Sequence, residues 1–184
     1  MGSESSMSTS KSLEDITIAT PVSPLCVGDI VRARVRRVAV FGLFCEYEHH
    51  EILVLIPEVS WIPCFASCEQ FAEVGDEWDI KIVHHDKERN KIAGSIRAIH
   101  PENDPWDGPW NLSVGDQVEA TVIRWVESAD RCGGSGGYLL ALRRAAFVML
   151  CGHEHGKWSP RDKCDVVITS LDKHRRTLVV ETRQ

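Results

Sequence analysis

The feature that most constrains the fold of this chain is an internal repeat. Residues 114–122 (VGDQVEATV) repeat the Gly-Asp turn and the strand-like pattern of residues 27–35 (VGDIVRARV). Residues 172–178 echo residues 86–92 at nearly the same separation along the chain. Self-similarity at a fixed period means that one structural unit is used more than once. We therefore expect two copies of a single small fold, arranged in tandem.

The first copy is predicted to consist of β-strands. Val31, Ala33 and Val35 alternate with arginines, so one side of this strand is apolar and the other is charged. Gly42 lies inside the next apolar run and indicates a bulge or a sharp bend. Further strands are predicted over residues 52–56, 78–82 and 91–96. Five bent strands favour a closed barrel, because closure leaves no exposed sheet edge.

The composition of the chain divides it into four predicted segments. Residues 1–25 are serine-rich with two prolines and are expected to form a mobile leader. Residues 26–100 form the first barrel, residues 101–112 a proline-containing linker, and residues 113–184 a degenerate second barrel. The two linker tryptophans, Trp106 and Trp110, are expected to pack against one or both barrels.

The charge balance limits the possible ligands. The formal net charge is -6 and the sequence pI is about 5.7. An obligate polyanion-binding protein needs clustered Lys and Arg to neutralise phosphates. Any nucleic-acid site must therefore be a local basic stripe.

The cysteine count and the hydropathy pattern indicate a compartment. The seven cysteines are an odd number without a regular framework, which favours a reduced intracellular protein. No stretch approaches 18 uninterrupted apolar residues and no secretory signal begins the chain. We expect a cytoplasmic protein that makes no contact with membranes.

Several segments contain residue types that occur in metal or catalytic sites. Cys64 and Cys68, and Cys151 with His153 and His155, offer zinc-type ligands but lack paired Cys-x-x-Cys spacing. The glycine loop at residues 131–137 lacks the Walker and dinucleotide-binding patterns, so a hairpin tip is favoured over a phosphate cradle. No nucleophile elbow or His-Glu-x-x-His motif occurs. We predict no metal, no cofactor and no enzymatic activity.

The first copy resembles the S1-domain family, an RNA-binding version of the oligonucleotide-binding (OB) barrel. The resemblance is carried by Gly28-Asp29, Phe41-Gly42-Leu43-Phe44, Ile56-Pro57-Glu58-Val59-Ser60, Val74-Gly75-Asp76, and Asp86 followed by Lys91-Ile92 and Ser95-Ile96. It covers nearly all of residues 26–106, because residues 103–106 are also similar to the spacer between repeats of the large ribosomal member. The resemblance implies an all-β chain of two tandem five-stranded OB barrels of S1 type.

The resemblance also implies a binding face on strands two, three and five, where aromatic rings stack on bases. The implied RNA-binding residues are Phe41, Phe44, Asp86, Lys91, Arg37 and Arg97. Two positions depart from the family pattern. Leu55 stands where the family has a histidine, and Ile52 replaces the usual glycine. One hydrogen-bonding contact of the family site is therefore lost.

Alternatives remain open for these residues. Phe41 and Phe44 are either an exposed stacking pair or part of the barrel core. The arginines that precede them form either a phosphate-tracking stripe or the solvated side of a strand; they are Arg32, Arg34, Arg36 and Arg37. In the second copy Leu139 takes the place of Phe44, which predicts a supporting role. Its arginines would at most touch backbone phosphates; they are Arg143, Arg144, Arg175 and Arg176.

The sequence thus predicts non-catalytic binding of single-stranded RNA in translation or RNA metabolism. The expected partners are single-stranded RNA and a ribosome or a protein complex, and the chain is expected to be a monomer. The alternative is an OB-fold protein-interaction module that has lost RNA binding.

Overall fold

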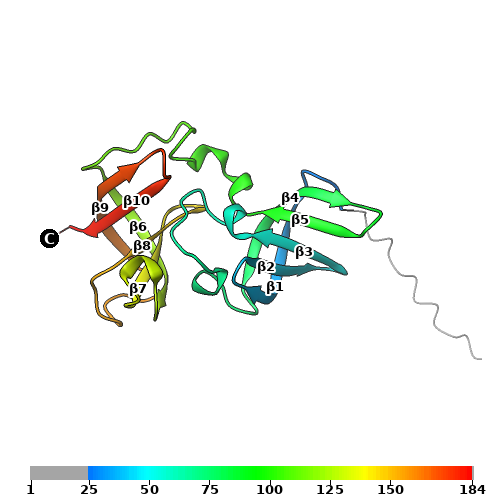
Figure 1. Ribbon diagram of the computed structural model, residues 1–184, viewed down its shortest axis with the longest axis horizontal. Coiled ribbons are helices and arrows are strands. Elements are labelled where there is room, and N and C mark those ends of the chain that lie inside the picture. The colour runs from blue at the N-terminus through cyan, green and yellow to red at the C-terminus, as the bar shows by residue number, and fades with distance from the viewer. Residues whose placement is uncertain (1–24, 184) are drawn as a thin grey trace, which may run out of the picture.

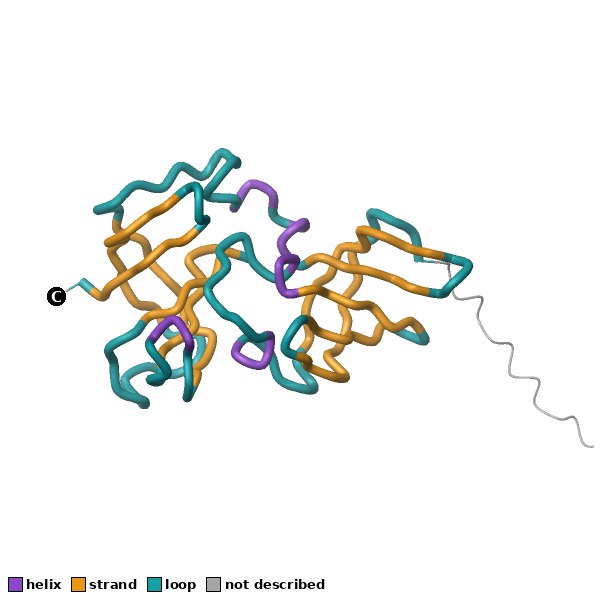
Figure 2. The backbone as a smooth tube through the Cα atoms, in the orientation of Figure 1, coloured by secondary structure: helices purple, strands orange, loops and turns teal. Residues whose placement is uncertain are grey.

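The computed structural model describes residues 25–183, so the predicted leader lies outside the described residues except for Leu25. The described chain is all-β, with two five-stranded sheets and short 3-10 turns (Figures 1 and 2). This confirms the predicted fold class. The 3-10 turns are η1 (Ile56–Glu58), η2 (Cys68–Gln70), η3 (Arg97–Ile99), η4 (Pro101–Asn103) and η5 (Asp130–Cys132). No helix in this part of the chain is long and apolar enough to cross a membrane.

The first sheet closes into a barrel in the order β1-β2-β3-β5-β4. Its strands are β1 (Ile30–Ala39), β2 (Gly42–Tyr47), β3 (His50–Leu55), β4 (Glu77–Asp86) and β5 (Lys91–Ser95). The apolar side of β1 fills the barrel, and Ala33 and Val35 are fully buried. Gly42 is the first residue of β2, directly after a turn. A larger residue would not fit there, because a Cβ would lie 2.8 Å from the Val54 carbonyl oxygen. Gly42 is therefore not a bulge or a bend within a strand: the chain reverses at residues 40–41, and the bulge lies in β1 between Val35 and Arg37.

Leu25, the last residue of the predicted leader, packs into the first barrel. Leu25 is buried in the barrel core, and its carbonyl oxygen lies 2.8 Å from Nδ1 of His85.

The second sheet keeps the five strands but not the closed ring. Its strands are β6 (Gln117–Val126), β7 (Gly137–Arg143), β8 (Ala146–Leu150), β9 (Lys163–Asp172) and β10 (Thr177–Thr182). Their order is β10-β9-β6-β7-β8. Within residues 25–183, no backbone ladder joins β8 to β10, which correspond to the paired strands β3 and β5. The second copy is therefore barrel-like, with one seam unpaired.

Strands β7 and β8 are covered on both faces. Every residue of β8 is buried, and so are all but Ala141 and Arg143 of β7. Leu140 and Val148 face the core of their own sheet. Leu139 and Phe147, on the opposite face, belong to one hydrophobic core with residues of the first barrel. The core of the molecule thus runs through the junction between the two sheets.

Aromatic and polar contacts hold this junction together. The ring centroids of Phe71 and Phe147 lie 5.0 Å apart. The backbone N–H of Trp61 donates to the Ala145 carbonyl at 2.8 Å. Both linker tryptophans are buried, which confirms the predicted packing of the linker. Nε1 of Trp106 donates to the Trp61 carbonyl at 2.6 Å. Figure 2 shows the short helical turns where the chain passes from one sheet to the other.

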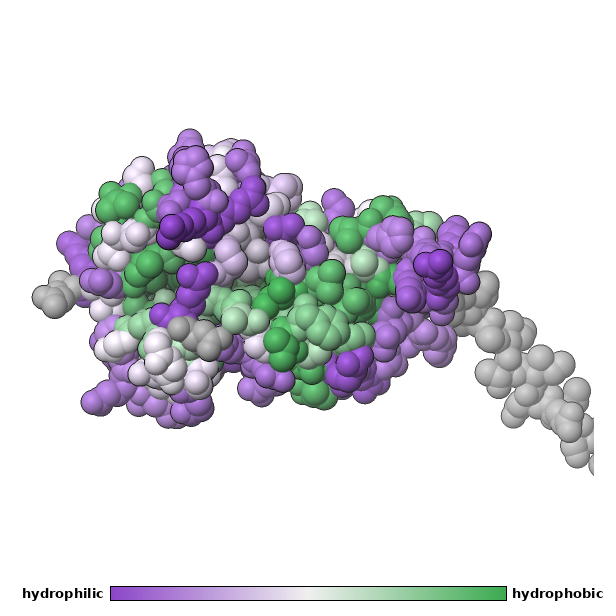
Figure 3. All heavy atoms as spheres, in the orientation of Figure 1, coloured by the Kyte–Doolittle hydropathy of each residue, from purple (hydrophilic) through white to green (hydrophobic). Residues whose placement is uncertain are grey.

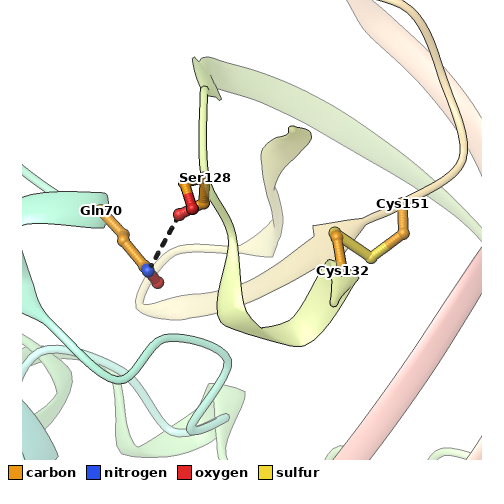
Figure 4. The surroundings of a disulfide bond; sticks show 4 residues. All are labelled: Gln70, Ser128, Cys132 and Cys151. Carbon is orange, nitrogen blue, oxygen red and sulfur yellow. Dashed lines mark hydrogen bonds between the residues drawn. A yellow bond between two sulfur atoms is a disulfide. The ribbon is translucent and has the colours of Figure 1, made fainter. Parts of the chain in front are cut away.

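The expectation that all cysteines are reduced is wrong for one pair. Cys132 and Cys151 form a disulfide, with Cα atoms 5.3 Å apart, that ties the loop before β7 to the residue after β8 (Figure 4). Adjacent strands bring these two thiols together, which their separation in the sequence did not indicate. The same loop contacts the first barrel, because Nε2 of Gln70 donates to the Ser128 carbonyl at 3.2 Å.

Candidate nucleic-acid interface

Phe41 and Phe44 flank the turn that leads into β2, and neither belongs to the core. Phe41 is 53% exposed and Phe44 is half-buried. Their rings meet edge to face, with centroids 5.9 Å apart. The buried apolar positions of β2 are those of Leu43 and Cys45 instead. The alternative that both phenylalanines fill the barrel is therefore excluded by the structure.

A row of paired residues crosses the outer surface of the barrel at Phe44. In the register of the sheet, Phe44 pairs with Arg37 on β1 and with Leu53 on β3. Leu53 pairs with Ala93 on β5, and Ala93 with His84 on β4. None of these five side chains is buried. Directly paired residues share one face of a sheet, so the row forms a continuous surface.

Arg37 covers the ring of Phe44. Its guanidinium carbon lies 3.4 Å from the ring centroid, within cation–π range. Arg37 forms no ion pair within the part of the chain that the structure describes. Its charge therefore remains available to an anionic ligand at the aromatic pair.

The remaining surface beside Phe41 is apolar. Val40 is 59% exposed, and Leu55, at the position of the family histidine, is 43% exposed. Figure 3 shows hydrophobic side chains gathered over the region of β2 and β3. The Leu55 side chain offers no hydrogen bond, so stacking and charge are the interactions that this surface can provide. We call the surface formed by Arg37, Phe41, Phe44, Leu53 and Leu55 the aromatic face.

Asp86 and Lys91 pair with each other where β4 turns into β5. Asp86 shapes this turn, because its carboxylate accepts from the backbone N–H groups of Glu88 and Arg89 at 3.1 Å each. Lys91 is exposed two residues before Ala93, so both side chains lie on the same outer side of β5. Lys91 thus extends the aromatic face toward the turn.

Arg97 lies apart from these residues. Its guanidinium pairs with the Glu58 carboxylate at 2.8 Å and lies 5.0 Å from the Trp61 ring centroid, beside the junction. The structure therefore brings together Phe41, Phe44 and Arg37. It places Lys91 on the same outer side of the barrel, next to Asp86 at the turn, and Arg97 elsewhere.

The other arginines of β1 are paired with carboxylates across the sheet. Arg32 contacts Asp79 at 3.2 Å, and Arg34 contacts Glu77 at 3.0 Å. Arg36 pairs with Glu46 and holds the pKa of that carboxyl below its ordinary value. Neighbouring acids offset three of the four charges of the predicted stripe. Arg37 is its one member without a carboxylate partner among the described residues.

In the second copy the equivalent face is turned inward. Arg124 occupies the place of Arg37, after an equivalent bulge in β6, and pairs with Leu139. Its guanidinium binds Glu73 at 2.8 Å and Asp76 at 2.6 Å, both in the first barrel. Leu139 is fully buried in the shared core. The face that would correspond to the aromatic face is thus occupied by the first barrel.

A sequence signal for this burial existed and was missed. The runs YLLAL and AFVML lack the apolar–polar alternation of a strand with one wet face. Unbroken apolar runs are typical of strands that are covered on both sides.

The two segments considered as metal sites differ in the structure: Cys64 and Cys68 are buried, and Cys151 is bonded to Cys132. Within residues 25–183, no three His, Cys, Asp or Glu side chains are grouped to hold a metal ion. Cys64 and Cys68 are buried, and burial raises the pKa of both thiols, that of Cys68 to about 12. These thiols are therefore protonated and act as small core side chains.

The sequence of residues 25–97 matches the profile of the S1 RNA binding domain family. Among curated proteins, small ribosomal subunit protein bS1 of Streptococcus pneumoniae is 36% identical over 101 residues, covering 54% of this chain and 24% of that protein. The bS1 protein of Pseudomonas aeruginosa is 26% identical over 161 residues, covering 85% and 28%. The chain thus spans about a quarter of the length of these relatives.

In other relatives the matching region is a smaller fraction of the protein. Polyribonucleotide nucleotidyltransferase of Streptococcus agalactiae is 30% identical over half of this chain and 13% of that enzyme. Among solved structures, GSP13 from Bacillus subtilis matches 42% of this chain and 59% of its own, with 32% identity and a TM-score of 0.38.

Proposed function

We propose that this protein binds single-stranded RNA without catalysing a reaction on it, because residues 25–97 match the S1 RNA binding domain family. The observation that carries the proposal is the aromatic face, where the exposed Phe41 and the half-buried Phe44 lie beside Arg37, which has no carboxylate partner among the described residues. The similarity to ribosomal proteins favours a role in translation, in the cytoplasm.

Stacking is the main term in the proposed recognition. A base stacked on an aromatic side chain contributes about 1–3 kcal/mol. An exposed cation–π contact, such as that between Arg37 and Phe44, contributes about 0.5–1 kcal/mol. A base therefore displaces the guanidinium from the ring. Arg37, once displaced, binds a backbone phosphate next to the stacked base.

The charge available for phosphates is small. Arg37 and Lys91 are the cations of the aromatic face and its extension, and each neutralised phosphate steepens the salt dependence by about 0.7 for single strands. We expect a slope of log K against log salt of about -1.4, and a modest affinity because the chain as a whole carries a net charge of -6.

The test is the double substitution Phe41→Ala and Phe44→Ala. It removes both stacking platforms, so affinity for a labelled single-stranded 12-mer is expected to fall at least tenfold in fluorescence polarisation. Val179→Ala is the matched control, because Val179 is 50% exposed on β10 and lies outside the aromatic face. Unchanged affinity of the folded double variant would refute the proposal.

A second function is favoured by a specific observation. Val40, Phe41 and Leu55 form an apolar surface, and the hydrogen-bonding side chain of the family site is absent. Such a surface suits a protein partner. This alternative predicts that the wild type does not bind RNA even at low salt. It also predicts that the wild type sediments with ribosomal subunits and that Phe41→Ala does not.

A further inference from the structure

A groove of about 540 Å³ lies between the two barrels. One wall comes from the first barrel, with Arg32 on β1, Trp78 on β4 and Ile99 in η3. The other wall comes from the second copy, with Ile123 on β6 and Phe147 on β8. None of the residues of the aromatic face lines this groove. It is therefore a separate cavity, and it requires both copies.

The inner wall of the groove is apolar and aromatic. The rings of Trp78 and Phe147 meet edge to face with centroids 6.2 Å apart, next to Ile96 and Ile99. Nε1 of Trp78 is buried, and no acceptor for it exists among the described residues. A buried donor without a partner costs stability.

The polar rim carries an excess of positive charge. Its cations are Arg32, Arg143, Arg144 and Lys163, and its acids are Asp79 and Glu119. The two acids are already neutralised, because Asp79 pairs with Arg32 at 3.2 Å and Glu119 with Lys163 at 3.1 Å. The surplus charge is therefore that of Arg143 and Arg144.

The two surplus arginines differ in their surroundings. Arg143 lies 4.4 Å from the Trp110 ring centroid, in a cation–π contact. The exposed side chain of Arg144 forms no ion pair and no hydrogen bond within residues 25–183. Its guanidinium is the one most available to an incoming anion.

We propose that this groove is a second ligand site, which binds a nucleotide. The phosphate pairs with Arg144 and is supported by Arg143, since the guanidinium fork matches phosphate oxygens. The base lies against the wall formed by Trp78 and Phe147. The volume is within the range of sites that hold small ligands. The nucleotide is either a free mononucleotide or one residue of a bound RNA strand.

The indole N–H of Trp78 provides a direct readout. In a ¹⁵N-labelled protein the six tryptophans give six indole signals, and Trp78→Phe identifies the signal of Trp78. The probes are adenosine 5′-monophosphate, adenosine, and a single-stranded adenylate 10-mer. Adenosine 5′-monophosphate is expected to shift the Trp78 signal saturably, and adenosine to bind at least fivefold more weakly because it lacks the phosphate.

Arg144→Gln tests the phosphate contact. The substitution is expected to lower the affinity for adenosine 5′-monophosphate at least fivefold and to leave the affinity for adenosine unchanged. Arg175→Gln is the control, because Arg175 is an exposed arginine beyond the end of β9 that does not line the groove.

The outcomes separate the sources of the ligand. A response to the mononucleotide supports a free ligand, and a response to the 10-mer alone that is lost in Arg144→Gln supports a nucleotide of the strand. A Trp78 signal that no probe moves, or that moves equally in Arg144→Gln, overturns the site. The double variant Phe41→Ala, Phe44→Ala is expected to keep the mononucleotide response, so failure of the groove and failure of the aromatic face are distinguishable.

Discussion

Gly94 is fixed by lack of space inside the first barrel. A Cβ at this position would lie 2.2 Å from Cγ2 of Ile80 and 2.8 Å from Cγ2 of Ile52. Ile52 stands where the family resemblance implies a glycine. The Ile52 side chain on β3 thus occupies the space that a side chain at position 94 on β5 would need.

Gly94→Ala is therefore expected to lower the free energy of unfolding by about 1–3 kcal/mol, because overpacking forces neighbours out of place. Urea denaturation of the purified variant measures this loss. Ile80→Leu removes the branch at Cβ that the new methyl group meets. The double variant Gly94→Ala, Ile80→Leu is therefore expected to recover part of the lost unfolding free energy. If the effects of Gly94→Ala and Ile80→Leu on the unfolding free energy simply add, the contact with Ile80 is not the cause of the destabilisation.

Single residues also mark the limit of prediction from the sequence. The sequence left open whether Phe41 and Phe44 are exposed or part of the core, and in the structure Phe41 is exposed and Phe44 half-buried. The partners of Arg32, Arg34 and Arg97 were not expected. Their carboxylates come from other strands and turns, and only the register of the closed sheet brings them within reach.

At the scale of elements, two contacts of the loop before β7 show what a sequence does not reveal. The disulfide joins Cys132 to Cys151, and the Arg131 guanidinium donates to the Pro63 carbonyl in the first barrel at 2.6 Å. Neither contact was predictable, since the glycines of this loop indicated only a flexible hairpin tip. The strands themselves were predictable, because each is bounded by turns of recognisable composition.

Opening the disulfide is expected to destabilise the protein by about 3 kcal/mol, since the loop that it closes spans about 20 residues. Cys151→Ser should lower the midpoint of thermal unfolding by several degrees, and dithiothreitol should lower that of the wild type equally. Cys26→Ser is the control, because Cys26 is exposed and forms no disulfide. A wild type whose unfolding midpoint is insensitive to dithiothreitol would contradict this expectation.

At the scale of the whole molecule, the two copies share one core. The family resemblance allowed two barrels to be predicted, but not their contact, because the predicted boundaries at residues 100 and 113 treat each copy as self-sufficient. In the structure Phe71 of the first barrel packs on Phe147 of the second copy, and Arg124 crosses the junction. We therefore expect the described part of the chain to unfold as a single cooperative unit.

Phe147→Ala tests this expectation. The substitution leaves a cavity at the junction and should lower the free energy of unfolding by about 3–5 kcal/mol. Amide hydrogen exchange should accelerate in β2 and β3 as well as in β7. Phe41→Ala is the matched control, because the exposed ring of Phe41 contributes little to the core. Faster exchange confined to the second copy would show that the barrels unfold separately.

The inward-facing surface of the second copy also limits how this pair of repeats could be rearranged in evolution or by engineering. Leu139 and Phe147 are covered only while the first barrel is present. A gene fusion that transplanted the second repeat alone would expose them to water and invite aggregation. The smallest portable unit is therefore the pair, and duplications or domain grafts that preserve solubility are expected to carry both repeats together.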